Sequence, residues 1–172
     1  VPAGTRVVLN WVAANRDQLK PPVGNKQMFP TGDDFITMVV GGPNQRTDYH
    51  VDPYEELFYQ VRGNMHVDVM TDQGPARVDI REGEMWVLPR GLPHSPQRPE
   101  PGSIGLVIER VREEGTLEAF RWYCPVCNGL VHEIELQVRD IVADLPPLFR
   151  AFYDSVDART CPACGTVHPG RG

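Results

Sequence analysis

Residues 46–56 read RTDYHVDPYEE and residues 83–94 read GEMWVLPRGLPH, and these two stretches decide both the fold and the chemistry that the sequence predicts. They contain two histidines, His50 and His94, and the carboxylate of Glu56. Two imidazole nitrogens and one carboxylate form the facial triad that holds iron(II) and leaves open positions for a substrate and oxygen. We therefore interpret His50, Glu56 and His94 as the ligands of one catalytic metal.

Glu55 is the main alternative to Glu56 as the acidic ligand. Neighbouring residues of a strand point to opposite faces, so only one of the two side chains can reach the metal. Asp52 precedes Pro53, a position that is typical of a turn residue, and this interpretation stays open beside a role in the site. Three further histidines are expected to be ordinary residues. His66 alternates with Met65 and Val67 on a strand and should be half-exposed, and His132 and His168 have no companion at ligand spacing.

The composition of the chain excludes several classes of partner. With 172 residues and a net charge of −6, it is long enough for one buried core and unsuited to a polyanion, so we expect no nucleic-acid partner. No apolar run approaches the roughly 20 residues that span a bilayer. The first residues lack the basic and apolar regions of a signal peptide. We expect a protein of the cytoplasm with no membrane contact.

Short β-rich runs separated by turn residues follow an N-terminal helix. We expect Asn10 to cap this helix over residues 10–19, Lys20-Pro21-Pro22 to end it, and residues 23–25 to be a plain connector. The expected strands are residues 35–40, 55–61, 65–70, 77–80, 85–88 and 104–111. The Gly63-Asn64 dipeptide is typical of a tight turn and predicts a hairpin between residues 55–61 and 65–70. This spacing predicts an all-β fold, a small antiparallel β-barrel or sandwich with a few short helices.

The character of the sequence changes near residue 115. Residues 117–123 are apolar and aromatic, residues 130–138 resemble a strand, and Pro146-Pro147 can open a helix over residues 148–155. We therefore predict a barrel with its N-terminal helix over residues 1–115 and a C-terminal extension over residues 116–172 that packs on the barrel.

The four cysteines form two C-x-x-C pairs, Cys124 with Cys127 and Cys161 with Cys164. Paired knuckles of this kind indicate a metal site in a reducing compartment more than disulfides. Four thiolates leave no open coordination position, so we expect a structural site, with electron transfer by a rubredoxin-type iron as the alternative. The ligands alone do not decide between iron and zinc.

The first stretch resembles the first motif of the cupin superfamily, G-x5-H-x-H-x(3,4)-E-x6-G. His50, Glu56 and Gly63 match its positions, and this spacing favours Glu56 over Glu55. Asp52 stands at the position of the second histidine. The resemblance therefore implies a cupin jelly-roll barrel with three metal ligands in place of four, and one more open position for a chelating substrate together with dioxygen.

The second stretch resembles the second cupin motif, G-x5-P-x-G-x2-H-x3-N, at each fixed position except the last. There Arg98 replaces asparagine, four residues beyond His94. A guanidinium group binds a carboxylate through two parallel hydrogen bonds, which fixes the orientation of the bound molecule. We therefore expect Arg98 to bind an anionic group of the substrate.

The chain also resembles the bacterial type of the 3-hydroxyanthranilate 3,4-dioxygenase family, which carries a C-terminal rubredoxin-like site. The resemblance spans roughly residues 11–170 and is carried by residues 41–44, 46–50, 55–56, 94–100, 105–110 and both cysteine knuckles. It implies iron(II)-dependent opening of an aromatic ring by dioxygen and a second iron or zinc at the cysteines. It also implies that Glu109 contacts the substrate together with Glu56 and Arg98, that Arg46 lies on the oxygen side of the site, and that the protein is a homodimer.

Two other functions stay open from the residues alone. One is a non-catalytic metal cupin that binds a small carboxylate, and the other is a metal-dependent cupin isomerase. Consumption of oxygen with 3-hydroxyanthranilate would exclude both. The pathway, quinolinate and NAD biosynthesis along the kynurenine route or aromatic degradation such as that of tryptophan, is a further question that these residues leave open.

Overall fold

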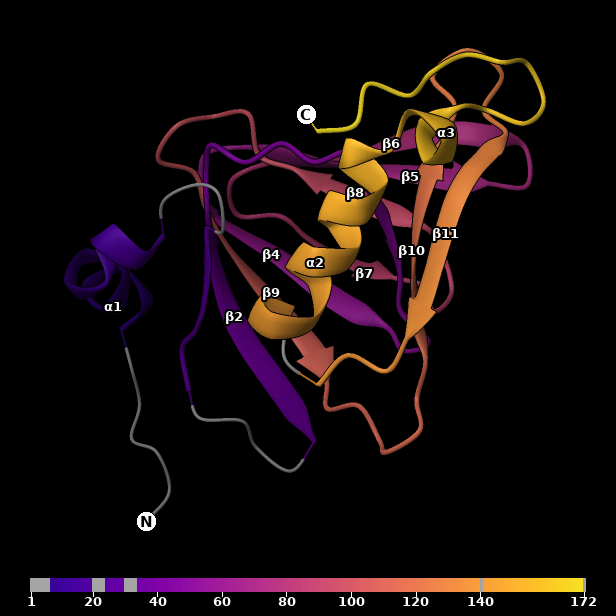
Figure 1. The fold of residues 1–172 in the computed structure, drawn as a ribbon. Helices are drawn as coiled ribbons and strands as arrows, with labels where there is room; N and C mark the ends of the chain where they lie inside the picture. Colours follow the sequence, from indigo (N-terminus) through magenta and orange to yellow (C-terminus); the bar gives the residue numbers. More distant parts are fainter. Residues whose placement is uncertain (1–6, 20–23, 30–33, 140, 172) are drawn as a thin grey trace.

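A computed structural model describes residues 7–19, 24–29, 34–139 and 141–171, and it consists of two facing antiparallel sheets (Figure 1). One sheet has the strand order β1-β2-β9-β4-β7, with bounds Asn25–Gln27, Phe35–Gly41, Ile104–Arg110, Glu56–Arg62 and Met85–Leu88. The other has the order β11-β10-β3-β8-β5-β6, with bounds Leu130–Leu136, Glu118–Tyr123, Tyr49–Val51, His94–Gln97, Met65–Thr71 and Gly74–Ile80. The prediction of an all-β antiparallel fold is confirmed.

The main core lies between the two sheets. In both β4 and β5 buried residues alternate with partly exposed ones, as expected for strands with one face turned inward. The inward side chains meet in one apolar cluster of Met38, Phe58, Met65, Val67, Val69, Ile80, Leu88 and Val107. Burial of this cluster from both sheets closes the barrel around the site described below.

The helix α1, Val8–Ala14, and the short 3-10 helix η1, Arg16–Gln18, cover the outer face of β2. Val12 of α1 and Leu19, which follows η1, are buried there in one cluster with Val39. The prediction that Asn10 caps the helix was wrong, because the helix begins at Val8 and places Asn10 in its first turn. The expected stop at Lys20-Pro21-Pro22 lies outside the described residues.

The prediction that residues 23–25 form a plain connector was wrong for Asn25, because β1 begins at this residue. Asn25 to Gln27 pair with Val40 to Met38 at the edge of the sheet. Such pairing uses backbone groups, so a short polar segment joins an edge without any apolar pattern that would reveal it in the sequence. Val23 is not among the described residues.

The hairpin predicted between residues 55–61 and 65–70 is wrong. Both strands exist, but β4 pairs with β7 and β9, whereas β5 pairs with β6 and β8 in the other sheet. Gly63, with φ +65°, turns the chain at this point from one sheet to the other. The inward face of β5 is apolar, whereas β4 turns Phe58 inward between Glu56 and Gln60. Facing each other across the core lets Phe58 join the apolar cluster of β5 and keeps Glu56 inside the barrel.

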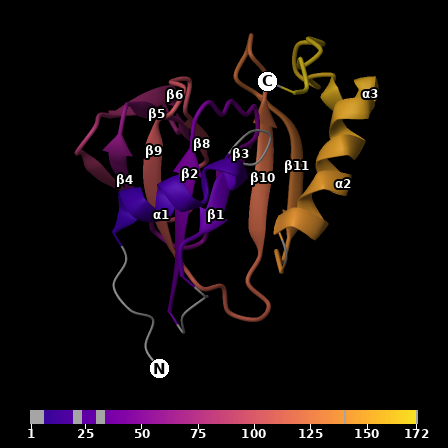
Figure 2. The same cartoon turned by 90° about the vertical axis from the view of Figure 1, so that its left-hand side faces the viewer.

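The C-terminal part adds two strands and two helices to the barrel. β10 pairs with β3, and β11 pairs with β10 at the edge of the six-stranded sheet. α2, Ile141–Asp154, covers this end of the sheet and is followed by α3, Val156–Arg159 (Figure 2). The division of the chain at residue 115 stays a prediction. No helix of the described part is long and apolar enough to cross a membrane.

The predicted start of the last long helix at residue 148 was wrong, because α2 begins at Ile141 and contains Pro146 and Pro147. Each proline removes one helical hydrogen bond and disfavours the preceding turn. The apolar side of α2 packs Phe149 and Phe152 against the indole of Trp122, with ring centroids 5.1 and 4.3 Å away. This packing stabilises α2 and offsets the helical hydrogen bonds that Pro146 and Pro147 remove.

Candidate active site

The structure brings His50, Glu56 and His94 together inside the barrel. His50 of β3 is the cross-strand partner of His94 of β8, and Glu56 begins β4 in the facing sheet. Glu56 Oε1 lies 3.1 Å from His94 Nε2 and 3.5 Å from His50 Nδ1. All three residues are buried, whereas Glu55 is exposed. Only Glu56 of the two glutamates therefore faces the histidines.

Hydrogen bonds fix which nitrogen each histidine presents to this point. His94 Nδ1 lies 3.1 Å from the backbone oxygen of Leu92, a contact in which the ring N–H donates and Nε2 stays available. His50 Nε2 lies 2.7 Å from Glu118 Oε2, which leaves His50 Nδ1 on the side of Glu56. A carboxylate or carbonyl behind each ring is the usual arrangement around metal-binding histidines, since it fixes the tautomer and the ring orientation.

The electrostatics of these three residues fit a bound cation. Burial lowers the pKa of His50, but its contacts with Glu118 and Glu56 raise that pKa to about 10. Burial raises the pKa of the Glu56 carboxyl, and the two imidazoles more than reverse this and hold its pKa well below the usual range. Glu56 Oε1 is buried and has no hydrogen-bond partner among the described residues. One ligand atom from each residue can meet within 4.8 Å, so the three residues fit a divalent metal ion.

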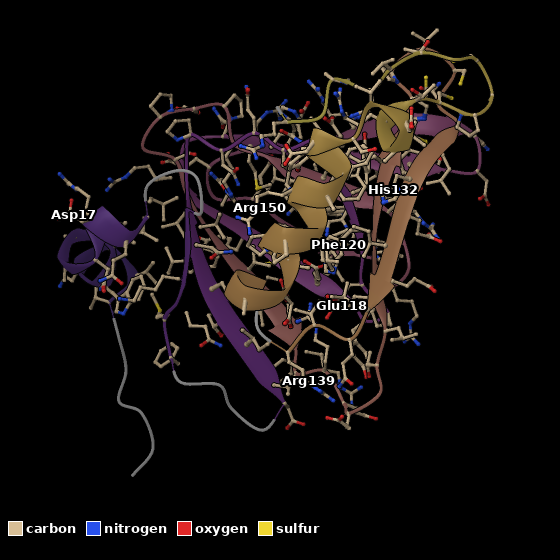
Figure 3. The ribbon with its side chains drawn as sticks, viewed as in Figure 1. Asp17, Glu118, Phe120, His132, Arg139 and Arg150 are labelled. Carbon is tan, nitrogen blue, oxygen red and sulfur yellow. The ribbon has the colours of Figure 1, made fainter. Side chains whose placement is uncertain are left out.

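Phe120 and Glu118 extend the site onto β10. Phe120 is the cross-strand partner of His50, and the two rings stack with centroids 4.9 Å apart and an interplanar angle of 14°. Figure 3 shows Glu118 and Phe120 in the part of the molecule that α2 covers. The sequence analysis did not identify Glu118, because no motif spacing links this residue to His50 and only the strand pairing brings the two together.

A second group of charged residues lies behind the histidines and centres on Arg112. Its guanidinium group contacts Asp52, Glu109 and Glu118 at 2.7, 2.5 and 2.8 Å. Asp52 also accepts a hydrogen bond of 2.7 Å from the backbone N–H of Tyr54, the contact expected of a turn residue. The sequence analysis did not identify Arg112, since a lone arginine after a strand carries no distinguishing pattern.

Glu109 lies beside Glu56, the carboxylate of the candidate metal site. It is the cross-strand partner of Glu56 between β9 and β4. Burial raises the pKa of Glu109 to about 7, and the negative charge of Glu56 raises it as well, while Arg112 opposes both. A pocket of about 340 Å³ opens at the surface here and includes Glu56 and Glu109 in its lining.

Arg98 follows β8 and is almost completely buried, at 1% exposure. Its Nη1 donates a hydrogen bond of 2.6 Å to the side-chain oxygen of Gln60. A Cβ atom at Gly105 would lie 2.6 Å from both Nη atoms, so glycine is needed there for the guanidinium group to lie against β9. Burial lowers the pKa of Arg98 to about 10. No carboxylate among the described residues lies within ion-pair distance of it, and its Nε has no hydrogen-bond partner there.

Arg46 lies in the segment before β3 and forms an ion pair with Asp48 through both Nε and Nη2. Its backbone oxygen accepts a hydrogen bond of 2.8 Å from the side chain of Gln97. Burial lowers its pKa, but Asp48 and the charge of Glu56 raise that pKa above the ordinary value. Arg46 is therefore within electrostatic reach of the metal ligands, although its contacts in this structure are with Asp48.

The four cysteines converge at the other end of β10. Cys124 Sγ lies 3.5 Å from Cys164 Sγ, and Cys127 Sγ lies 3.6 Å from Cys161 Sγ. All four sulfurs meet within 4.8 Å and none forms a disulfide. A tetrahedral set of thiolates fits zinc or iron and has no open position.

The two knuckles have closely similar backbones. In the first, Asn128 N–H donates to the oxygen of Cys124, and in the second Gly165 N–H donates to the oxygen of Cys161. Asn128 and Gly165 both have positive φ, 60° and 75°. Glycine adopts this conformation without strain, and asparagine is among the few other residues that tolerate it. The hydroxyl of Thr166 lowers the pKa of the Cys164 thiol to about 6, which favours the thiolate.

Comparison with known proteins places these features in a family. A model described as 3-hydroxyanthranilic acid dioxygenase matches residues 4–153. The chain is 55% identical over 161 residues to 3-hydroxyanthranilate 3,4-dioxygenase of Burkholderia cenocepacia, with 94% of this chain and 90% of the relative covered. It is 54% identical over 163 residues to the enzyme of the same name from Brucella anthropi, with 94% and 89% covered.

Solved structures are similar to part of this chain. Protein TT1209 from Thermus thermophilus has a TM-score of 0.50 at 12% identity and covers 64% of this chain and 100% of its own. An RmlC-like cupin from Shewanella frigidimarina has a TM-score of 0.43 at 18% identity and covers 55% of this chain and 83% of its own. The two facing antiparallel sheets, with His50 and His94 paired across β3 and β8, form a cupin-like fold.

Proposed function

The chain belongs to the 3-hydroxyanthranilic acid dioxygenase family, and from this premise we propose that it converts 3-hydroxyanthranilate and dioxygen to 2-amino-3-carboxymuconate semialdehyde, the precursor of quinolinate. This places the protein among the dioxygenases of the kynurenine route to NAD. The observation that carries the proposal is the buried group of His50, Glu56 and His94 in one barrel with Arg98, a buried cation that has no carboxylate within ion-pair distance among the described residues.

The catalytic metal is iron(II), held by His50, Glu56 and His94. Iron(II) in such a site supplies open positions for the substrate and dioxygen and passes electron density between them. The chain contributes the orientation of both imidazoles through Leu92 and Glu118. Burial of all three ligands keeps water from competing for the site.

Arg98 binds the carboxylate of 3-hydroxyanthranilate. His94 and Arg98 are four residues apart and lie on the same face of an extended segment, at about 13 Å between their backbones. A long arginine side chain and a single aromatic ring together span such a distance. A buried guanidinium group with no carboxylate partner among the described residues is costly by itself, and an anionic ligand would supply the missing charge.

Glu109 holds the amine or hydroxyl end of the substrate. One of its oxygens is bound to Arg112, which leaves the other for a substrate N–H or O–H. A carboxyl with a pKa of about 7 can also accept a proton at neutral pH. Arg46, on the opposite side of the ligands by family resemblance, adds positive charge on the side where dioxygen enters.

The cysteine site holds a second iron, or zinc, with a structural role. Its four thiolates complete a tetrahedron, and no substrate position remains. The knuckles join the end of β10 to the C-terminal segment, so the metal would hold these parts of the chain together. Four free thiols also agree with a reducing compartment such as the cytoplasm.

The protein assembles as a homodimer. Three large apolar side chains, Phe35, Met85 and Val87, are 63, 65 and 49% exposed. The pairing of β7 with β4 places Met85 and Val87 on the outer face of the five-stranded sheet, opposite to the buried Phe58. Exposed apolar surface of this kind is typical of protein interfaces. Light scattering coupled to gel filtration would measure the mass, and a monomer at micromolar concentration would contradict this part of the proposal.

The direct test of the function is oxygen uptake by the iron(II)-loaded protein. We expect uptake that depends on 3-hydroxyanthranilate, one oxygen molecule for each substrate, together with the absorbance of the ring-opened product. Binding of 3-hydroxyanthranilate without oxygen uptake would instead indicate a non-catalytic metal protein. Conversion in the absence of oxygen would indicate an isomerase.

A further inference from the structure

Arg112 lies where the two sheets of the barrel are joined. It follows β9 of the five-stranded sheet and precedes β10 of the six-stranded sheet, while Asp52 lies between β3 and β4 and joins the same two sheets. The ion pair of 2.7 Å between Arg112 and Asp52 therefore ties two crossing connections together. These connections flank the strands that carry His50 and Glu56.

Among the arginine–carboxylate pairs of the described residues, those of Arg112 have the most buried arginine side chain. The Arg112 side chain is 12% exposed, and its partners Asp52, Glu109 and Glu118 are 1, 9 and 3% exposed. Water screens such contacts weakly, so each is stronger than a surface pair, and removal of the cation would leave buried carboxylates without a partner. The planar guanidinium group holds its N–H donors in a rigid fork, and separate nitrogens, Nη2, Nη1 and Nε, contact the three carboxylates. An ammonium group is a compact charge with rotatable donors and does not hold three carboxylates in these fixed directions.

Two of these carboxylates connect Arg112 to the chemistry. Glu118 binds Arg112 through Oε1 at 2.8 Å and His50 through Oε2 at 2.7 Å, so it bridges the guanidinium group and a metal ligand. Glu109 binds Arg112 through Oε2 at 2.5 Å and pairs across the strands with Glu56. One arginine thus sets the direction of a carboxylate behind a metal ligand and of a carboxylate beside the substrate position.

We propose that Arg112 is a positioning residue for ring opening, which acts through Glu118 on the orientation of the His50 ring and through Glu109 on the substrate. The action on the substrate through Glu109 rests on the function proposed above. The action on the His50 ring through Glu118 rests on the contacts of Glu118 with Arg112 and His50. Asp52, at the place of the second histidine of the motif, anchors the third side of the guanidinium group and thereby holds Arg112 in place.

Arg112→Lys tests the proposal because it keeps the charge and removes the three-way geometry. The matched control is Arg121→Lys, which alters an arginine–glutamate pair with Glu133 at the exposed edge of β10 and β11. We expect Arg112→Lys to bind iron in the normal amount but to lower kcat/KM by at least about tenfold, and Arg121→Lys to change neither.

A spectroscopic measurement separates positioning from a loss of stability. The iron(II)-loaded protein is exposed to nitric oxide without oxygen, and its electron paramagnetic resonance spectrum reports the geometry of the ligands around the metal. We expect an altered spectrum for Arg112→Lys and an unchanged one for Arg121→Lys. A wild-type spectrum together with wild-type kcat/KM in Arg112→Lys would overturn the proposal. If the wild-type protein does not catalyse the proposed reaction, the oxygen-uptake assay shows this. The spectrum still tests the effect of Arg112 on the metal ligands, because it is recorded without turnover.

Glu118→Gln gives an independent test, which also serves if Arg112→Lys does not fold. Glutamine keeps the size of the side chain and removes the charge that Arg112 holds, and Glu133→Gln on β11 is its control. We expect the altered spectrum in Glu118→Gln alone. The double variant of Arg112→Lys and Glu118→Gln should change the spectrum and kcat by less than the sum of the single effects, since both act through one contact. Fully additive effects, or an unchanged spectrum in Glu118→Gln, would show that Arg112 does not act through Glu118.

Discussion

The histidine–glutamate site and the cysteine site are built in opposite ways. The first takes its ligands from β3, β4 and β8, which belong to two sheets, and His50, Glu56 and His94 are all buried. The second takes its ligands from two short turns at the surface, where Cys127 and Cys164 are exposed. An open three-ligand site inside a barrel can bind a substrate, whereas a closed four-thiolate site has no open position for one.

The difference teaches how each site depends on the rest of the protein. Each cysteine knuckle is a local turn, so the backbone around the sulfurs is determined by a few neighbouring residues. The histidine–glutamate site depends on strand pairing and on side chains from distant parts of the chain, such as Glu118. The following predictions, ordered by their expected effect on turnover, test this contrast.

Replacement of His50, Glu56 or His94 by alanine should abolish turnover. Each change removes one of three ligands and leaves an incomplete site, so about one iron per chain should be lost while the cysteine-bound metal remains. Oxygen uptake and metal analysis of the purified variants measure both effects. Glu55→Ala is the control, and loss of activity there with full activity in Glu56→Ala would show that the other glutamate is the ligand.

Arg98→Ala should raise KM for 3-hydroxyanthranilate by at least about tenfold, since a charge-assisted contact contributes about 1.5–3 kcal/mol. Iron content should not change, because arginine is not a ligand. Steady-state kinetics with 2-aminophenol provide the control, as this compound has the chelating pair but no carboxylate. An equal loss of activity with both compounds would mean that Arg98 shapes the site and does not bind the substrate carboxylate.

Gly105→Ala should have a similar but smaller effect than Arg98→Ala. The added Cβ would lie 2.6 Å from both Nη atoms of Arg98 and 2.8 Å from the side-chain oxygen of Gln60, so the guanidinium group must move. We expect KM to rise by about threefold to tenfold with little change in kcat. In the double variant of Arg98→Ala and Gly105→Ala, KM should be almost the same as in Arg98→Ala alone. A fully additive rise in KM would show that Gly105→Ala does not act through the Arg98 guanidinium group.

Cys161→Ser should lower stability and leave turnover per catalytic iron close to normal. Loss of a structural metal is among the larger single effects, about 3 kcal/mol or more in the free energy of unfolding. Denaturant unfolding and metal analysis measure the loss. Normal unfolding combined with absence of turnover would instead point to electron transfer through the cysteine site.

The smallest effect concerns the backbone of the second knuckle. Gly165 has φ +75° and no atom within 4 Å of an added Cβ, so substitution there costs only backbone strain. Gly165→Ala should lower the free energy of unfolding by about 1 kcal/mol, and Gly165→Asn, which copies Asn128 of the first knuckle, by less. Equal losses of unfolding free energy for Gly165→Ala and Gly165→Asn would show that the second knuckle does not need a residue that tolerates positive φ, as the first does at Asn128.

Local patterns in the sequence predicted most strands correctly but not how they pair. Residues 85–88 form β7 as expected, and the expected strands at 35–40 and 104–111 differ from β2 and β9 by one residue at one end. The hairpin at Gly63 was wrong, because alternation shows which face of a strand is apolar but not whether the next strand lies beside it or opposite to it. The strands β1 and β3 have three residues each, too few for a reliable pattern, and β8 is a polar segment that contains Pro96.

The sequence by itself determined which side chains form the two candidate metal sites. The spacing of His50, Glu56 and His94 and the two C-x-x-C pairs are properties of residue order, and the structure places each set of side chains within reach of one ion. Strand alternation, which is also local, shows that only one of Glu55 and Glu56 can reach the metal, and the motif spacing favours Glu56.

Only the tertiary structure decided what surrounds these ligands. Glu118 reaches His50 because β10 pairs with β3, and Arg112 meets Asp52 because two connections cross between the sheets at the same end of the barrel. Arg98 lacks a carboxylate among the described residues because the barrel buries it next to Gln60 and Gly105. Such contacts join residues far apart in the chain, and the energy of a buried charge depends on all its neighbours at once, which no local sequence pattern records.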